Sequence, residues 1–337
     1  QTYSIPITAS WELDIFGKMR NAKKQAQALY AQSQDYRQAV RTQLIAGIAN
    51  TYYSLLMLDA QLKISEQTAS SWKETVNSTR ALMNAGIVNE TAVSQMEATY
   101  YSICTSILDL KEQINQTENS MALLLAETPH KIQRGKLENQ QLPEDFSVGI
   151  PLQMLSNRPD VRSAEFSLAQ AFYTTNAARA AFYPSITLSG SAGWTNSAGA
   201  MIINPGKFLA SAVGSLTQPL FNRGQVVAQY RIARAQQEEA ALGFQQTLLN
   251  AGSEVNDALI AYQTSQGKRI LLDKQITSLQ TALRSTTLLM EHGNTTYLEV
   301  LTSRQSLLSA QLSQTANHFT EIQSLINLYR ALGGGQE

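Results

Sequence analysis

Three histidines and one cysteine are the side chains in this sequence best suited to bind a metal ion or act as a nucleophile: His130, His292, His318 and Cys104. A zinc site on a helix needs closely spaced ligands, such as two histidines four positions apart. The histidines are isolated from one another, and a single cysteine excludes both an internal disulfide framework and a cysteine-based zinc site. We expect Cys104 to be a small buried side chain and His292, beside a glycine, to be a polar turn residue.

The sequence also lacks a loop suited to phosphate binding. Gly333, Gly334 and Gly335 follow a helical pattern rather than a strand, so we expect a frayed tail there. Lysine plus arginine and aspartate plus glutamate both number 26, and no basic stripe is present for a phosphate backbone. We therefore expect a protein that is not an enzyme, with no catalytic residue, cofactor, metal or nucleic-acid partner.

Hydropathy gives no sign of a membrane-spanning helix. The longest apolar runs, such as Ala122 to Ala126, are far shorter than the ~18 residues that such a helix needs. The first seven residues have no basic region, apolar core or cleavage site, so they are not a signal peptide. They resemble the middle of a strand, and we expect that the natural N-terminus lies upstream of Gln1.

Two long helical patterns dominate the sequence, and each ends in a turn with a glycine at its centre. The first extends over residues 18–84, and Gly86 separates it from a second pattern, about half as long, at residues 90–126. The same arrangement recurs around Gly293, which follows Gly86 by 207 residues (293 − 86), and a shorter helix follows at residues 297–332. The sequence therefore predicts a duplicated helical hairpin.

A regular seam follows each long helix. Helices far longer than the mean of ~11–12 residues must be held by packing, and a spacing of about 3.5 residues keeps one face against a neighbour. In the first repeat the seam positions are Leu44, Ile48, Thr51, Leu55, Leu58, Leu62, Ser65, Ala69, Trp72, Val76, Thr79 and Met83. In the second they are Leu272, Ile276, Leu279, Leu283 and Met290.

Segments of alternating polarity precede the long helices. From Tyr3 to Ile15 every odd position is apolar, which predicts a two-faced strand long enough to cross a bilayer, for which ~9–11 residues suffice. An ordinary edge strand remains the alternative for this segment. Residues 182–194 alternate likewise, and residues 208–221 form a weaker returning strand. We expect these two segments to form a hairpin around a loop at residues 196–206.

Strands and helices of these lengths cannot close a compact core within one chain. The strands need partners along their edges, and each long helix exceeds the helix that folds back on it. A ring of protomers would close the strands into a barrel and the helices into a tube. The alternative is a structural coiled-coil rod or fibre component without a conducting pore, which would have no use for long two-faced strands.

Four segments match a family. They are Leu155 to Glu165 (LSNRPDVRSAE), Ala178 to Gly190 (ARAAFYPSITLSG), Trp11 to Lys18 (WELDIFGK) and Gln218 to Phe221 (QPLF). In these motifs the sequence resembles the TolC-like outer membrane factors, the channel components of tripartite efflux systems. It is most similar to the branch that works with resistance-nodulation-division pumps, and the resemblance covers essentially the whole chain.

The resemblance implies a mainly α fold with β, in which strand, long helix, turn and helix are duplicated. In the full homotrimer these would form an outer-membrane β-barrel continuous with a periplasmic α-helical barrel, in a Gram-negative bacterium. The implied function is passive conduction of substrates, opened at the periplasmic tip. The implied partners are an adaptor (membrane fusion) protein, a resistance-nodulation-division pump and outer-membrane lipid. The leading helices, the first strand, the signal peptide and any lipid-carrying cysteine would lie upstream.

The resemblance also implies roles for particular residues. The turns would dock the adaptor, through Gly86, Ile87, Thr91, Gly293, Asn294 and Thr295. Glu299 would form a ring of three carboxylates at the pore constriction, because Thr302 and Ala92 at related positions are not acidic. The structural signature would be Arg158, Pro159, Asp160 and Pro184. Two plainer interpretations remain open, namely that the glycines only form turns and that Glu299 is only an exposed helix carboxylate.

The expected boundaries follow from the same alignment of patterns. They are a barrel strand at 1–16, a first long-helix hairpin at 17–126 with its tip turn at 84–90, an equatorial connecting segment at 127–157, a helix at 158–181, a barrel hairpin at 182–221, a second long-helix hairpin at 222–332 with its tip turn at 291–296, and a tail at 333–337.

Overall fold

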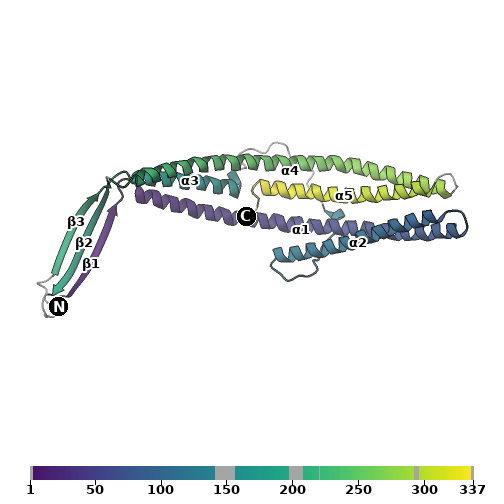
Figure 1. The fold of residues 1–337 in the computed structure, drawn as a ribbon, viewed down its shortest axis with the longest axis horizontal. Helices are drawn as coiled ribbons and strands as arrows, with labels where there is room; N and C mark the ends of the chain where they lie inside the picture. The colour runs from purple at the N-terminus through teal and green to yellow at the C-terminus, as the bar shows by residue number, and fades with distance from the viewer. Residues whose placement is uncertain (1–2, 141–155, 197–207, 220, 292–295, 335–337) are drawn as a thin grey trace. The chain divides into compact units, whose positions relative to one another are not determined.

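The computed structural model describes residues 3–140, 156–196, 208–219, 221–291 and 296–334. Its elements, labelled in Figure 1, are in chain order β1 (Tyr3–Leu13), α1 (Lys18–Asn84), α2 (Glu90–Leu124), the short 3-10 helix η1 (Leu137–Asn139), α3 (Pro159–Ala180), β2 (Ser185–Asn196), β3 (Phe208–Thr217), α4 (Gln225–Glu291) and α5 (Tyr297–Ala331). None of the described helices contains a stretch apolar enough to cross a membrane.

The chain divides into two compact units. One consists of residues 1–37 and 159–249, and holds the sheet, α3 and the first part of each long helix. The other consists of residues 38–158 and 250–337, and holds the rest of the long helices with α2 and α5. Both long helices therefore contribute to both units.

The predicted duplication is confirmed at the level of helix ends. α1 and α4 each have 67 residues, and α4 begins and ends 207 positions after α1 (225 − 18 and 291 − 84). α2 and α5 each have 35 residues and are offset by the same 207 positions (297 − 90 and 331 − 124). The hairpins were thus predicted to within about two residues at the described ends.

The repeat extends to backbone conformation. Gly17 and Gly224, 207 positions apart, both have positive φ, at 78° and 75°. Ala126 and Gly333, also 207 apart, have φ of 57° and 77°. After α2, the amides of Ala126 and Glu127 donate to the carbonyls of residues 123 and 122; after α5, those of Gly333 and Gly334 donate to residues 330 and 329. Each short helix therefore ends in the same left-handed cap.

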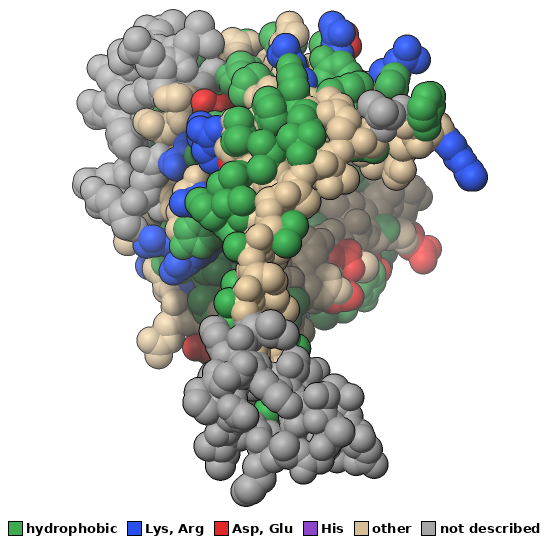
Figure 2. All heavy atoms as spheres, turned by 90° about the vertical axis from the view of Figure 1, so that its left-hand side faces the viewer, with side chains coloured by type: hydrophobic (Ala, Val, Ile, Leu, Met, Phe, Trp, Pro, Cys, Tyr) green, Lys and Arg blue, Asp and Glu red, His purple; other side chains and the backbone are tan. Residues whose placement is uncertain are grey.

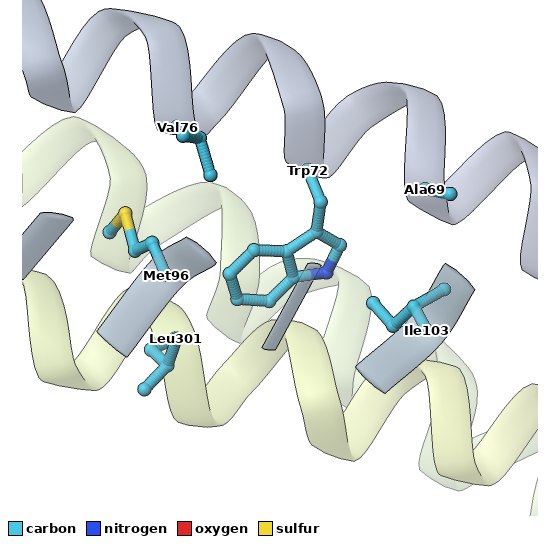
Figure 3. Close-up of a cluster of buried hydrophobic side chains, with 6 residues drawn as sticks. All are labelled: Ala69, Trp72, Val76, Met96, Ile103 and Leu301. Atoms are coloured by element: carbon cyan, nitrogen blue, oxygen red, sulfur yellow. The ribbon is translucent and has the colours of Figure 1, made fainter. Parts of the chain in front are cut away.

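The seam predicted for α1 is buried as expected, with one exception. All of its positions are buried or half-buried except Leu44, which is 41% exposed. At its centre, Trp72 is 1% exposed and points from α1 between Met96 and Ile103 of α2 (Figure 3). Leu301 of α5 completes the same core cluster. Burial of these side chains holds the two hairpins together, at about 1.5–3 kcal/mol for each large one.

The three strands form one antiparallel sheet in the order β1-β2-β3, so the predicted β2–β3 hairpin is confirmed. The register places apolar residues and glycine in the same rows: Ile7 with Ala192, Ala9 with Gly190 and Ala212, Trp11 with Leu188 and Gly214, and Leu13 with Ile186 and Leu216. The intervening rows carry mainly serine and threonine. One face of the sheet is therefore apolar and the other mainly polar, and hydrophobic side chains cover much of the side seen in Figure 2.

A close approach of backbones explains a glycine in β2. Gly193 lies opposite Pro6 of β1. A Cβ atom on Gly193 would lie 2.7 Å from the carbonyl oxygen of Ile5 and 2.9 Å from the Cα of Pro6. Proline lacks an amide hydrogen for the ladder, and the glycine allows the β1 backbone at Ile5 and Pro6 to approach β2 closely.

Two strand ends differ from the sequence prediction. β1 stops at Leu13, before the expected Ile15 and Phe16, because Asp14 turns its carboxylate to the start of α1. The two carboxylate oxygens of Asp14 accept hydrogen bonds from the amides of Met19 and Arg20, at 2.9 and 2.8 Å. β3 ends at Thr217, and Gln218 donates a side-chain hydrogen bond to the Phe182 carbonyl at 2.8 Å.

The expected frayed tail is wrong for its first two glycines. Gly333 packs so closely on the chain before α3 that a Cβ atom would lie 2.9 Å from the carbonyl oxygen of Asn157. The carbonyl of Gly334 accepts a hydrogen bond from the hydroxyl of Thr42 at 2.7 Å. The segment is ordered because the glycines form the left-handed cap and contact α1; residues 335–337 lie outside the described residues.

The segment after α2 is tied down by one arginine. Arg134 pairs with Asp59 of α1 and Glu118 of α2, and its Nη2 lies 2.9 Å from the Asp59 carboxylate. The amide of Gly135 donates to the hydroxyl of Tyr52 at 3.2 Å. These two carboxylates raise the pKa of Arg134, so the clamp stays charged at any ordinary pH. Residues 141–155, the remainder of the expected connecting segment, lie outside the described residues.

The caps generate a prediction about stability. Ala126 holds a left-handed conformation that costs an L-residue about 1–2 kcal/mol, whereas Gly333 fills the equivalent position without this cost. We expect Ala126→Gly to raise the thermal unfolding midpoint, and Gly333→Ala to lower it more strongly because its Cβ would also meet Asn157. Circular dichroism at one fixed heating rate would measure both shifts. A destabilised Ala126→Gly protein would contradict this interpretation.

Candidate functional site

The first hairpin tip is an exposed glycine turn. The amide of Gly86 donates to the carbonyl of Met83 at 2.9 Å, and that of Ile87 to Leu82 at 3.0 Å, so Gly86 terminates α1 with φ of 75°. A Cβ atom on Gly86 would meet nothing within 4 Å. Ile87 is 68% exposed and Thr91 is exposed. The predicted tip residues thus lie together at the end of the hairpin, with an unpacked apolar side chain among them.

The two short helices begin differently. α2 begins with Asn89 as its N-cap, whose side-chain oxygen accepts from the amide of Ala92 at 3.1 Å. α5 follows Thr296, which makes no side-chain cap, and carries Glu299 exposed in its first turn. Ala92, the counterpart of Glu299, is fully buried. The predicted residues Gly293, Asn294 and Thr295 lie outside the described residues, as does His292.

Three hydrogen bonds join the second hairpin to the first near this tip. The hydroxyl of Tyr297 donates to the side-chain oxygen of Gln95 at 3.0 Å, and the amide of Gln305 to the hydroxyl of Thr99 at 3.5 Å. Higher up, Nη1 of Arg304 donates to the Ser71 hydroxyl at 2.7 Å. Sequence reasoning did not find these pairs, because single polar residues that meet across helices leave no period in the sequence.

A groove extends along the contact of α1, α2 and α5. It has a volume of about 730 Å³ and a floor that includes Trp72, Ile103 and Leu308. Its walls are mostly small or hydroxyl-bearing, with Ala98, Ser102 and Ser106 on α2 and Gln305, Ser309 and Ser313 on α5. These two sets are spaced four residues apart and are offset by 207 positions (309 − 102). Small side chains at this spacing allow another helix to approach closely.

Arg158, which directly precedes α3, binds the C-terminal end of α5. Arg158 is 5% exposed, and its Nη1 donates to the carbonyl of Ala331, the last residue of α5, at 2.9 Å. Its Nη2 pairs with Glu254 of α4 at 2.9 Å. Pro159 opens α3, and Asp160 accepts from the amide of Val161 at 2.9 Å. Arg158 therefore ties the end of α5 to α4, and Pro184 lies half-buried just before β2.

The candidate metal ligands and nucleophile have ordinary surroundings. Cys104 is half-exposed, not buried as expected, because it lies near the uncovered face of α2 on which Tyr101 and Leu108 are exposed. His130 is exposed and lies 2.9 Å from the carbonyl of Thr128. Burial lowers the pKa of His318, which keeps its imidazole neutral. Among the described residues, no group of three or more His, Cys, Asp or Glu side chains is placed to hold a metal ion.

Comparison with known sequences identifies a family. The family described as "Outer membrane efflux protein" matches residues 1–127 and 150–334. The cation efflux system protein CusC of Escherichia coli (strain K12) is 28% identical over 338 residues, which cover 99% of this chain and 73% of that protein. The toluene efflux pump outer membrane protein TtgC of Pseudomonas putida is 29% identical over 335 residues, which cover 97% and 68%.

Solved structures give the same result. The chain matches a crystal structure of CusC with a TM-score of 0.91 and 28% identity, over 99% of this chain and 78% of that chain. It matches the open state of the MtrE outer membrane channel of Neisseria gonorrhoeae with a TM-score of 0.89 and 28% identity, over 100% of this chain and 76% of that chain. Both matches include both repeats.

Proposed function

Because the chain belongs to the outer membrane efflux protein family, we propose that it works as a homotrimer whose hairpin tips are opened by a periplasmic adaptor protein. The chain is an outer-membrane channel that conducts substrates out of a Gram-negative cell, with its helices in the periplasm. The observation that carries this conclusion is the match of the whole chain to solved channels at a TM-score of 0.91. The rod interpretation is disfavoured, because a rod has no use for a sheet with one apolar face.

The proposal of a trimer is supported by the open sheet. β1 and β3 each pair only with β2 among the described strands, so each leaves one edge of backbone groups unpaired. Such edges are not tolerated in lipid, where each unsatisfied group costs several kcal/mol. Pairing with neighbouring protomers closes the edges and turns the apolar face, with Trp11 and Leu188, toward outer-membrane lipid.

We assign adaptor docking to the tip and the groove above it. Gly86 and Ile87 present a bare, partly apolar surface, and the small residues on α2 and α5 leave room for a helical hairpin of a partner. An inner-membrane pump of the resistance-nodulation-division type would drive transport through the same assembly. A passive tunnel needs no catalytic residue, cofactor or bound metal.

The contacts between the two hairpins keep the periplasmic mouth of the proposed channel closed. For the two hairpins to splay, the bonds of Tyr297 with Gln95 and of Gln305 with Thr99 must break. Glu299, exposed at the start of α5, would contribute one carboxylate from each protomer to the narrowed mouth. Three carboxylates in a confined pore attract cations and repel anions.

The cargo is selected elsewhere in the assembly. Two relatives of similar identity to this chain, 28% and 29%, carry different substrates in their names, a cation and toluene. The resemblance to these relatives therefore points to no single cargo. We assign substrate choice to the pump.

Substitution at the tip tests adaptor docking. We expect Gly86→Trp to abolish export while the trimer still assembles, since nothing within 4 Å would clash with a Cβ at this position. Gly86→Ala is the matched control, because it carries the same backbone strain without the bulk. Gly293→Trp would test the second tip in the same way. Export assays with cross-linking of the trimer would measure both effects, and unaltered export in both tryptophan variants would refute docking at the tips.

Measurement of ion selectivity in planar bilayers would test whether the protein forms a conducting pore and whether Glu299 narrows it. We expect the full-length protein in planar bilayers to form channels with modest cation selectivity, which Glu299→Gln removes. Glu90→Gln, at an exposed carboxylate in the first turn of α2, should leave the reversal potential unchanged. Absence of conductance would favour the rod, and unchanged selectivity in Glu299→Gln would exclude the carboxylate ring.

The contact between hairpins sets the closed state. Removing the hydroxyl of Tyr297 loses one hydrogen bond of about 0.5–1.5 kcal/mol, so Tyr297→Phe should raise the open probability at least about twofold. Tyr101→Phe is the control, because Tyr101 is an exposed tyrosine of α2 with no described hydroxyl partner. Single-channel recording would measure the difference, and equal open probabilities in both variants would contradict this role.

A further inference from the structure

Arg304 is a partly buried cation whose Nε has no hydrogen-bond partner among the described residues. It lies on α5, and its Nη1 donates to the Ser71 hydroxyl at 2.7 Å. The Nε atom itself is buried. Nε and the adjacent Nη2 form one side of the guanidinium, so this two-pronged edge is left without a described acceptor.

Among the described residues, no carboxylate forms an ion pair with this arginine. Glu74 of α1 is near enough to act on it electrostatically, but the described residues form no ion pair with Arg304. Burial lowers the pKa of Arg304 and the charge of Glu74 opposes that shift, yet an arginine remains protonated in proteins. A buried charge with one neutral hydrogen bond is costly, and a bound anion would offset that cost.

Arg304 lines a cavity with a volume of about 230 Å³. The other polar side chains of its lining include Gln67, Thr68, Ser71 and Gln311. Its polar groups are amides, hydroxyls and the guanidinium, and none of the lining residues is acidic. The volume exceeds the roughly 30 Å³ of one water several-fold, so a five-atom oxyanion fits together with some water.

The free donor of this cavity is the guanidinium. The indole of Trp72 also lines the cavity, but Figure 3 shows its nitrogen on the side of the ring toward Ile103, which is not among the lining residues. A buried Nε without a described partner, with no acidic acceptor in the lining, is the arrangement expected beside a bound anion.

We propose that this cavity binds a small oxyanion, of the sulfate, phosphate or carboxylate type, through the Nε and Nη2 edge of Arg304. The lining comes from α1 of the first hairpin and from α4 and α5 of the second. A bound anion therefore stabilises the present packing of the two hairpins, to an extent set by its concentration relative to its dissociation constant. The site depends neither on adaptor docking nor on the charge at the mouth, so it stands or falls separately from them.

Crystals of the full-length trimer soaked in selenate would locate the anion. Selenium gives an anomalous signal that water and chloride do not mimic at its absorption edge. We expect one selenate per protomer within hydrogen-bonding distance of Nε and Nη2 of Arg304. Water alone at this position, or a carboxylate of a neighbouring protomer paired with Arg304, would overturn the proposal.

Binding in solution can be tested by substitution. With ionic strength held constant, we expect sulfate to raise the unfolding midpoint of the wild-type trimer in a saturable manner, and Arg304→Gln to abolish that shift. Arg80→Gln is the matched control, because Arg80 is already paired with Glu97 near the tip. Should Arg304→Gln not assemble, Arg304→Lys keeps the charge but removes the Nε and Nη2 edge, and it should weaken binding several-fold. Equal shifts in wild type and variants would exclude the site.

Discussion

The unpaired backbone of the two outer strands is the constraint on which the rest of this structure depends. Among the described strands, β1 and β3 each bond to one neighbour, and the rows that include Trp11 and Leu188 make one face of the sheet apolar. In lipid, such a sheet is stable only when every edge is paired. The proposed closure with copies of the same chain would satisfy the edges, and it would also supply neighbours for exposed apolar side chains such as Tyr36 and Val40 on α1.

The duplication also explains how the two short helices, α2 and α5, end. Each short helix must stop where the chain turns away, and both stop in the same left-handed cap, at Ala126 and at Gly333. The chain that follows each cap makes different contacts. The chain after Ala126 continues to the clamp formed by Arg134, whereas Gly333 packs against the segment before α3, where Arg158 binds the end of α5. One inherited backbone motif thus anchors two different connections.

The sequence predicts those parts of the fold that repeat. The period of two revealed the strands, the 3.5-residue seam revealed the buried face around Trp72, and the 207-residue offset located the described helix ends to within about two residues. It could not reveal contacts that occur once. Asp14 ends β1 early through hydrogen bonds to the next helix, and Tyr297 meets Gln95 only because two hairpins are packed together. The ordered conformation of Gly333 likewise depends on its packing against Asn157, which is distant in sequence.

The hydrogen bonds between hairpins set one part of the energy of opening, beside the burial of Leu301 against the first hairpin. Three hydrogen bonds, at Tyr297, Gln305 and Arg304, would contribute about 3 kcal/mol per protomer at ~1 kcal/mol each, and about 9 kcal/mol in a trimer that opens in one step. A partner shifts such an equilibrium only by its differential affinity for the open form. Divided over six hairpin tips, that requirement is about 1.5 kcal/mol per tip, the contribution of one well-buried aliphatic side chain. In the proposed trimer, a shallow contact at each exposed tip, such as the one that Ile87 offers, would offset the hydrogen-bond part of the energy of opening when all six act together.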